Sequence, residues 1–426
     1  MKIYLISLLL TCCTYAGFAQ QELRIHHINV KNGDATLIGI YDNGTQKYTR
    51  TMLIDGGSAS PGERLLPYLK QTLNSDHPKL NYVALTHYHD DHYTGLLAIK
   101  DGDLQADSVI DQGGYQMNDI FPNQTLPDTH EVKPGAMVVY TGWTSALTKA
   151  VANDYVRGHV TGLFHYGNTA ESDLGHKLLL GTIQGIPVTL ECVAGWGNTL
   201  NGSGITSDLS PTRTNANNFS LAFILNYGQF RYFIGGDLGG DRKSPYIDQE
   251  TPLTTYLNKD FPSAWSWNHT KQAAGHICGF KANHHGSEHS NSIAFIQGMS
   301  PAITVVSAGE QKSWKLPRPD YLQHFSDETP LSVWTTVSNE VYNKGIYVTN
   351  LYDFEGIPSK TTAMETFANK PGVSFDYGNA TTEAYSSYMI KIKPDGINQK
   401  SQFQVYRVDN SGSSTVLLAN FLCHSL

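Results

Sequence analysis

Three histidines and two aspartates within seven residues constrain this chain more than any other feature. The run is Thr86-His87-Tyr88-His89-Asp90-Asp91-His92, and it directly follows the strand-like segment 82–85. Neutral imidazole nitrogens and carboxylate oxygens are ligands of borderline-soft divalent ions. The His-x-His spacing places two rings on one side of an extended turn, and the Asp-His pair after it can reach a second ion. The run therefore predicts a metal site at the end of a strand, rather than a loop that is histidine-rich by chance.

The first residues predict an exported protein. Lys2 precedes an apolar run, and Gly17-Phe18-Ala19-Gln20 has the small-x-small pattern of a cleavage site. We therefore interpret residues 1–19 as a signal peptide and expect a secreted or periplasmic protein. The pair Cys12-Cys13 leaves a lipoprotein as a minority alternative, because neither cysteine follows a convincing lipobox. No later stretch of about 18 apolar residues occurs, so we expect no transmembrane segment in the mature chain.

The charge of the chain bears on its binding partners, and its cysteines bear on the disulfides that it can form. The formal net charge is −8, and the chain has no run rich in Lys and Arg. This balance argues against strong binding of duplex nucleic acid. The predicted mature chain keeps Cys192, Cys278 and Cys423, which allow one disulfide plus one free thiol, or no disulfide.

Strand-like and helix-like apolar patterns alternate along much of the chain. Residues 62–73 carry leucines at helical spacing. Strand-like segments are 23–30, 35–40, 51–54, 82–85, 220–225, 231–234, 280–282 and 303–306. This order predicts an α/β fold. The pair His26-His27 falls within a strand pattern, so we expect one of the two rings to face the core or a neighbouring sheet.

Two parts of the chain depart from this order. Residues 100–215 are rich in Gly, Asn, Asp and Thr, and we expect them to form a mid-chain insertion with short strands, at one wall of a cleft. Residues 329–426 alternate Val, Tyr, Thr and Phe with turn residues, which predicts a β-rich C-terminal extension. The main domain is then expected to span residues 20–328.

Polar residues follow several predicted strands, which is how α/β folds assemble active sites. The motifs at these strand ends resemble those of the metallo-β-lactamase superfamily. They are His-x-His-x-Asp-His at 87–92, Asp55-Gly56-Gly57, Gly236-Asp237 and His284-His285-Gly286-Ser287. The resemblance implies an αββα sandwich with metal ions at one edge of two packed sheets.

Within that superfamily, further segments look like the hydrolase domain of ComEC-type competence proteins. They are Asn32-Gly33-Asp34-Ala35, Asn217-Asn218-Phe219-Ser220-Leu221, Ile234-Gly235-Gly236-Asp237, Lys281-Ala282-Asn283-His284-His285-Gly286-Ser287 and residues 307–319. The resemblance covers about residues 22–325, and the insertion is unmatched.

The resemblance implies one or two divalent metal ions, Zn or Mn, and a set of ligands. The first ion would be bound by His87 and His89, the second by Asp91 and His92, with Asp237 bridging them. His285, or less favourably His284, would complete the second site. A bridging carboxylate holds two ions about 3.5–4 Å apart, where a shared hydroxide can attack in line. Asp91 is also a catalytic candidate, because it can hold the attacking water.

Other residues are candidates for supporting roles. Asp55 can accept a hydrogen bond from a ligand imidazole and fix its tautomer. His284 can contact a phosphoryl or carbonyl oxygen, as hydrogen-bond donor or general acid. Ser287 is a candidate substrate contact. A structural imidazole at His284 and plain loop chemistry at Ser287 remain the alternatives.

One departure from the superfamily pattern concerns the first metal site. Many members carry another histidine just before the hairpin, where this chain has Asn217-Asn218. An amide oxygen is a weaker ligand than imidazole, which favours a looser site or a harder ion such as Mn²⁺ over Zn²⁺. Alternatively, His159, His165 or His176 of the insertion folds back to this site, although no spacing singles one out.

These observations predict a secreted metal-dependent hydrolase that uses a metal-bound hydroxide. A small-molecule or polymeric phosphoester, most of all a phosphodiester, is the expected substrate, because the competence-type motifs imply it. One alternative is a lactonase or β-lactamase that hydrolyses a carboxylic ester or amide. Another is a non-catalytic binding protein with a structural metal site.

Overall fold

The computed structural model describes much of the chain outside its first 20 residues. The ranges are 21–58, 64–87, 89–99, 103–110, 174–195, 197–207, 215–240, 246–258, 277–299, 301–309, 316–318, 321–322, 325, 344–351, 373–379, 386–392, 400–409 and 411–424. The predicted signal peptide, His159 and His165 lie outside the described residues. No helix within these ranges combines the length and the apolar character needed to span a bilayer.

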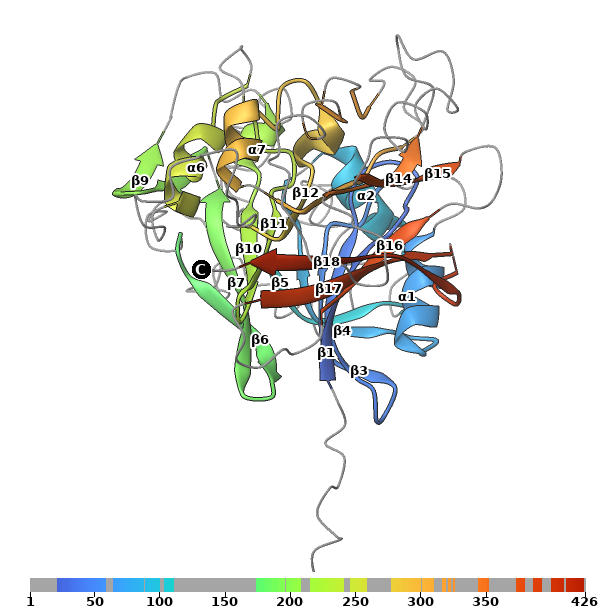
Figure 1. Ribbon diagram of the computed structural model, residues 1–426. Helices are drawn as coiled ribbons and strands as arrows, with labels where there is room; N and C mark the ends of the chain where they lie inside the picture. The colour runs from blue at the N-terminus through green and yellow to red at the C-terminus, as the bar shows by residue number, and fades with distance from the viewer. Residues whose placement is uncertain are drawn as a thin grey trace, which may run out of the picture.

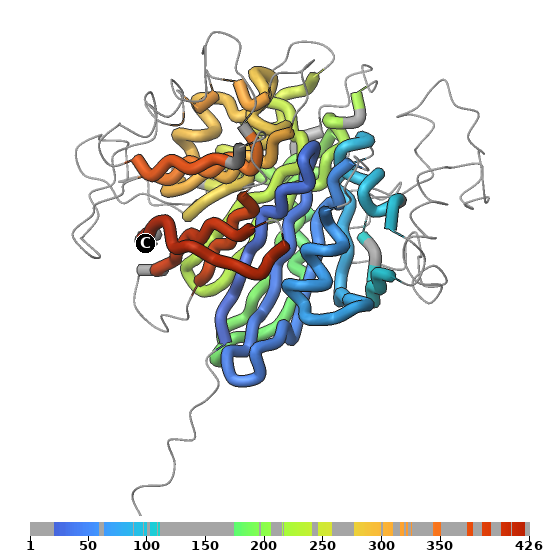
Figure 2. Tube along the Cα trace, turned by 90° about the vertical axis from the view of Figure 1, so that its right-hand side faces the viewer, coloured from blue at the N-terminus to red at the C-terminus, as the bar shows by residue number. Residues whose placement is uncertain are grey.

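The first sheet has eight strands within the described residues, in the order β18-β17-β16-β1-β2-β3-β4-β5. They are β1 (Gln21–His27), β2 (Thr36–Asp42), β3 (Lys47–Ile54), β4 (Lys79–Ala84), β5 (Gln105–Ile110), β16 (Ser387–Ile392), β17 (Lys400–Val408) and β18 (Thr415–His424). β3, β4 and β5 run parallel to one another, whereas β1 is antiparallel to both of its neighbours. Figure 2 shows the red C-terminal strands beside the blue N-terminal ones.

The second sheet has ten strands in the described part of the chain, and most follow the order β15-β14-β13-β12-β11-β10-β7-β8-β9, with β6 paired to β7. They are β6 (Lys177–Ile183), β7 (Ile186–Gly195), β8 (Asn198–Asn201), β9 (Gly204–Ser207), β10 (Ala222–Tyr227), β11 (Phe230–Ile234), β12 (Gly279–Lys281), β13 (Ile303–Val306), β14 (Lys344–Leu351) and β15 (Val373–Asn379). β10 and β11 form the predicted hairpin. β11 to β15 run parallel, so their carboxyl ends lie at the same edge.

Helices lie on the outer sides of the two sheets (Figure 1). They are α1 (Leu65–Leu73), α2 (Asp90–Ala98), α6 (Glu250–Asn258) and α7 (Ile293–Met299). α1 packs on the first sheet, where the Tyr68 hydroxyl lies 2.8 Å from His26 Nδ1 of β1. α7 packs on the second, where Phe295 meets Phe233 of β11 with ring centroids 5.4 Å apart. α1 ends at Asn74, whose left-handed backbone (φ 50°) is a common helix stop.

The two sheets face each other across an apolar core. Phe230 of β11 contacts Phe403 of β17 with ring centroids 5.5 Å apart. His27 of β1 reaches Tyr232 of β11, and the hydroxyl oxygen lies 2.8 Å from His27 Nε2. With helices outside both sheets, the layers follow the predicted αββα order, and the α/β fold class is confirmed.

The C-terminal region is β-rich, as predicted, but its strands complete both sheets instead of forming an appendage. β14 and β15 extend the second sheet, whereas β16, β17 and β18 extend the first. The segment 100–215 likewise contributes to both, since β5 pairs with β4 and β7 pairs with β10. Edge strands need a partner for their backbone N–H and C=O groups, and distant segments of the chain provide it here.

The cysteines in the described part of the chain are of two kinds. Cys278, which precedes β12, is disulfide-bonded. Cys192 on β7 is a buried free thiol. A disulfide together with a free thiol is one of the two patterns that the cysteine count allowed.

Candidate metal centre

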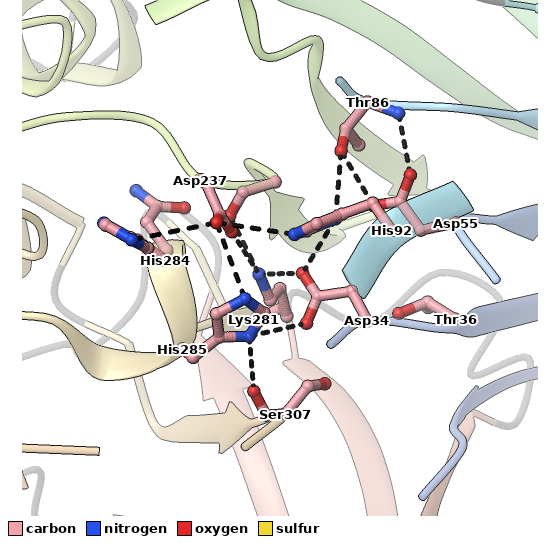
Figure 3. A network of polar contacts seen from close by, with 12 residues as sticks. Asp34, Thr36, Asp55, Thr86, His92, Asp237, Lys281, His284, His285 and Ser307 are labelled. Atoms are coloured by element: carbon pink, nitrogen blue, oxygen red, sulfur yellow. Dashed lines mark hydrogen bonds and ion pairs between the residues drawn. The ribbon is translucent and has the colours of Figure 1, made fainter. Parts of the chain in front are cut away.

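The carboxyl ends of five strands from both sheets meet at one site (Figure 3). Asp55 follows β3, His87 follows β4, Asp237 follows β11, His285 follows β12 and Ser307 follows β13. Parallel neighbours bring such ends together within each sheet, and residues from the two sheets then meet, as His92 and Asp237 do.

Asp237 lies at the centre of this cluster. Its Oδ2 is 3.4 Å from His92 Nε2 and 3.5 Å from His285 Nε2. The same oxygen is 3.7 Å from His87 Nε2 and 4.0 Å from His284 Nε2. One buried carboxylate oxygen therefore faces four imidazole nitrogens.

The remaining predicted ligands lie beside this centre. Asp91, at the start of α2, places Oδ2 3.2 Å from His285 Nε2 and Oδ1 3.8 Å from His92 Nε2. His89 Nδ1 is 3.0 Å from His87 Nε2. The ligand atoms of Asp91, His92 and His285 lie within 4.8 Å of one another, as do those of His87, His92 and Asp237. All six residues predicted to bind metal are thus brought together.

The buried polar atoms of the cluster fit a divalent ion. His92 Nε2, His285 Nε2 and Asp237 Oδ1 are buried, and none has a hydrogen-bond partner within the described residues. Buried polar atoms are nearly always satisfied, so several without a partner at one place fit the binding of an ion. Imidazole nitrogens and carboxylate oxygens suit Zn²⁺ or Mn²⁺.

Asp55 orients the His92 ring by contacting Nδ1, the ring nitrogen that does not point into the cluster. It accepts hydrogen bonds from the Thr86 N–H and hydroxyl, both at 2.7 Å, and its Oδ2 lies 2.9 Å from His92 Nδ1. The bond fixes the ring so that Nε2 points into the cluster. His285 is held in the same way, because its Nδ1 donates to the Ser307 carbonyl at 2.7 Å.

The charges of the cluster balance one another. Burial lowers the pKa of His87 well below its usual range, so the ring is neutral and can bind a cation. Burial acts the same way on His92, but the carboxylates of Asp237 and Asp55 outweigh it and raise the pKa. For Asp237, burial acts to raise the pKa, but His285 and His92 outweigh it and hold the pKa well below its usual range. A bound divalent ion would take over this balancing role.

Two buried residues of the site, Asp34 and Lys281, had been given no role from the sequence. Lys281 Nζ pairs with Asp34, donates to the Gly236 carbonyl at 2.8 Å and lies 3.8 Å from Asp237 Oδ1. Asp34 Oδ1 lies 3.4 Å from His285 Nδ1. Both residues stand within the motif segments, and the available signal was a charged residue at the end of an apolar strand for Lys281 and just before one for Asp34.

The supporting candidates lie in different places. Asn217 Nδ2 is 3.3 Å from His284 Nε2, so these two side chains meet beside the cluster. Burial lowers the pKa of His284 to about 4, so the ring is neutral near pH 7. Ser287 accepts from the His289 N–H at 3.2 Å and bonds within its own loop rather than to the cluster. His176 is exposed beside β6, outside the buried cluster, so it does not replace Asn217.

The fold and the site define a mixed α/β protein with a buried histidine and aspartate centre between two sheets. Residues 32–102 match the family model of the metallo-beta-lactamase superfamily. The matched range contains Asp34, Asp55 and the whole histidine run. Residues 32–102 are therefore similar to this superfamily, and the chain combines that segment with a candidate metal site and a β-rich C-terminal region.

Solved structures that are similar to this chain include the following three. The metallo-beta-lactamase fold protein YhfI from Bacillus subtilis has 12% identity and a TM-score of 0.35, over 73% of this chain and 93% of its own. Unliganded yeast PDE1 has 10% identity and a TM-score of 0.36, over 85% and 98%. A point mutant of the CmlA beta-hydroxylase has 12% identity and a TM-score of 0.32, over 69% and 47%. No curated protein matches the chain.

Proposed function

We propose that this protein is an exported metal-dependent hydrolase that acts on a phosphodiester or another phosphoester. The observation that carries the proposal is the position of Asp237, whose Oδ2 lies 3.4–4.0 Å from four imidazole nitrogens. A buried carboxylate surrounded in this way is typical of a bridging metal ligand.

The ligands divide into two sets. His87 and His89 would hold one ion, and Asp91, His92 and His285 the other, with Asp237 shared. Bound divalent ions would acidify a water and polarise the ester oxygen. Asp91 has the most exposed carboxylate among the ligand aspartates, at 20% compared with 2% for Asp237. This exposure supports our assignment of Asp91 as the residue that orients the attacking water and accepts its proton.

His284 is assigned to the substrate rather than to the metal. Its side chain is 16% exposed, and its Nε2 is the most distant of the four imidazole nitrogens from Asp237 Oδ2. The neutral ring can donate one hydrogen bond to a phosphoryl oxygen. Asn217, at 3.3 Å from this ring, would hold it in place.

The choice of a phosphoester rests on sequence motifs. The segments around Asn217-Asn218 and His284-His285-Gly286-Ser287 resemble the ComEC-type hydrolase domain, which implies phosphodiester substrates such as nucleic acid or phosphorylated envelope polymers. Export is proposed from residues 1–19 and their signal-peptide pattern.

The test combines metal analysis with an ester screen. The mature protein is loaded with Zn²⁺, Mn²⁺ or Mg²⁺ and assayed with bis(p-nitrophenyl) phosphate, nitrocefin and a lactone. We expect phosphodiester turnover that is lost in His89→Ala and Asp237→Ala and kept in His77→Ala, whose ring is exposed. A wild-type protein that binds none of the ions, or turns over only nitrocefin or the lactone, would overturn the proposal. Bound metal without any turnover would instead support a binding protein.

A further inference from the structure

The two histidines after β12 have a backbone that is unfavourable for their residue type. His284 has φ 48° and ψ 46°, and His285 has φ 53° and ψ 25°, both in the left-handed region. For residues with a Cβ this conformation costs about 1–2 kcal/mol each. It also turns two adjacent rings towards Asp237, which neighbouring side chains of an extended segment would not do. The surroundings must therefore hold this turn in place.

Glu250, the first residue of α6, contacts the loop that carries this turn. Its side chain is fully buried, and its carboxylate accepts hydrogen bonds from three donors. They are the Asn291 N–H at 2.6 Å, the Ser292 N–H at 2.7 Å and Asn283 Nδ2 at 2.9 Å. No Lys or Arg within the described residues pairs with Glu250, so these donors are what compensates its burial. That burial raises the pKa of Glu250 to about 7.

Asn291 completes the connection to the histidine turn. Its Oδ1 accepts from the Asn283 N–H at 2.8 Å, and its Nδ2 donates to the Asn283 carbonyl at 2.8 Å. Asn283 is the residue directly before His284. Both its backbone and its side chain are thus fixed, and the position of the two rings follows.

The same helix start is also joined to the loop that follows Asp237. The Gln249 N–H donates to the Gly239 carbonyl at 2.9 Å, and the Gly240 N–H donates to the His289 carbonyl at 2.8 Å. A Cβ at Gly240 would stand 2.0 Å from Glu250 Oε2, so only glycine leaves room for the carboxylate. Glu250 therefore lies between the loop of Asp237 and the loop of His285.

We propose that Glu250 is a positioning residue of the metal centre, whose buried carboxylate sets the distance between Asp237 and His285. It contacts neither the ions nor the substrate, and it acts through Asn283 and Asn291. The inference rests on the proposed function, because it assumes that the cluster binds metal. Supporting residues of this kind typically change metal affinity 10–100-fold when replaced.

Glu250→Gln tests this role, because the amide keeps the shape but turns an N–H₂ group towards backbone donors. The matched control is Glu191→Gln. Glu191 lies on β7 and is also buried. Its carboxylate accepts a hydrogen bond from the hydroxyl of Tyr256, which is a residue of α6. Metal affinity is measured by competition with a chromogenic chelator, and ligand geometry by the visible absorption of the Co²⁺-loaded protein. We expect at least about a tenfold loss of affinity and a changed Co²⁺ spectrum for Glu250→Gln, and neither for Glu191→Gln.

A second variant tests the same role independently, in case Glu250→Gln does not fold. Asn291→Gly removes both side-chain bonds to Asn283, and glycine adopts the φ of 60° found at this position without strain. It is expected to weaken metal binding as Glu250→Gln does, with circular dichroism unchanged. Wild-type affinity and spectrum in a folded Glu250→Gln or Asn291→Gly protein would overturn the role of Glu250. A wild-type protein that binds no metal would instead overturn the proposed function.

Discussion

Replacing Lys281 by methionine is expected to destabilise the protein by about 3–5 kcal/mol. Lys281 is 1% exposed and its partner Asp34 is 2% exposed, so water cannot solvate either charge. Methionine keeps the length and the apolar stem of the side chain, so the packing changes little. The loss comes from Asp34, whose buried charge loses its nearest cationic partner, and from the 2.8 Å bond to the Gly236 carbonyl.

The assay is urea unfolding of the metal-free protein, followed by circular dichroism and by the fluorescence of its tryptophans. Lys79→Met is the control, because Lys79 is 60% exposed and pairs with Asp107 at the surface, where such a pair contributes about 0–1 kcal/mol. Asp34→Asn and the Asp34→Asn/Lys281→Met double variant complete a cycle, with an expected coupling energy of about 1–3 kcal/mol. Equal losses for Lys281→Met and Lys79→Met, or strictly additive effects in the cycle, would refute the reasoning.

Three further predictions test the core, the pH dependence and the domain boundary. In urea unfolding, Tyr232→Phe is expected to cost about 1–3 kcal/mol because it removes the partner of His27, whereas Tyr227→Phe is expected to be neutral or stabilising. The Tyr227 hydroxyl is buried and has no hydrogen-bond partner among the described residues. Burial lowers the pKa of His27 to about 3 from 6.5, so the unfolded chain takes up the proton first as the pH falls. The contribution of His27 to the free energy of unfolding is therefore complete above pH 6.5, and about 2 kcal/mol is lost by pH 5. In His27→Gln, the free energy of unfolding is expected to differ less between pH 7 and pH 5. A chain that ends at residue 328 is expected not to fold, because it lacks β14 to β18; cooperative unfolding of this fragment would contradict that expectation.

The cluster was predictable because each of its parts has a local signal. The histidine run follows an apolar strand, and Asp237 and His285 follow short strands that end in glycine or polar residues. Strand ends of this kind can be read from the sequence without knowing which strands are neighbours. Parallel pairing brings the strand ends together within each sheet, and the packing of the two sheets joins both groups, so six separate predictions describe one site.

The remaining features depend on pairings between distant segments. β1 pairs with β16, whose residue Ile390 lies opposite Ile25, and no local pattern indicates such a partner. The local strand pattern predicted that one ring of the pair His26-His27 faces the core or a neighbouring sheet, whereas the structure buries both rings. α1 covers one face of β1 and the second sheet covers the other, so both rings find buried hydroxyl partners. The pairing of Lys281 with Asp34 likewise joins the two sheets.

This pairing also decides which carboxylates face the proposed ions. Asp34 is neutralised by Lys281, and Asp55 is occupied by Thr86 and His92. Asp91 and Asp237 remain as the carboxylates that face the Nε2 atoms of His92 and His285. The four positive charges of two bound divalent ions would then be balanced by Asp91, Asp237, Asp55 and the attacking hydroxide, since Asp34 already pairs with Lys281.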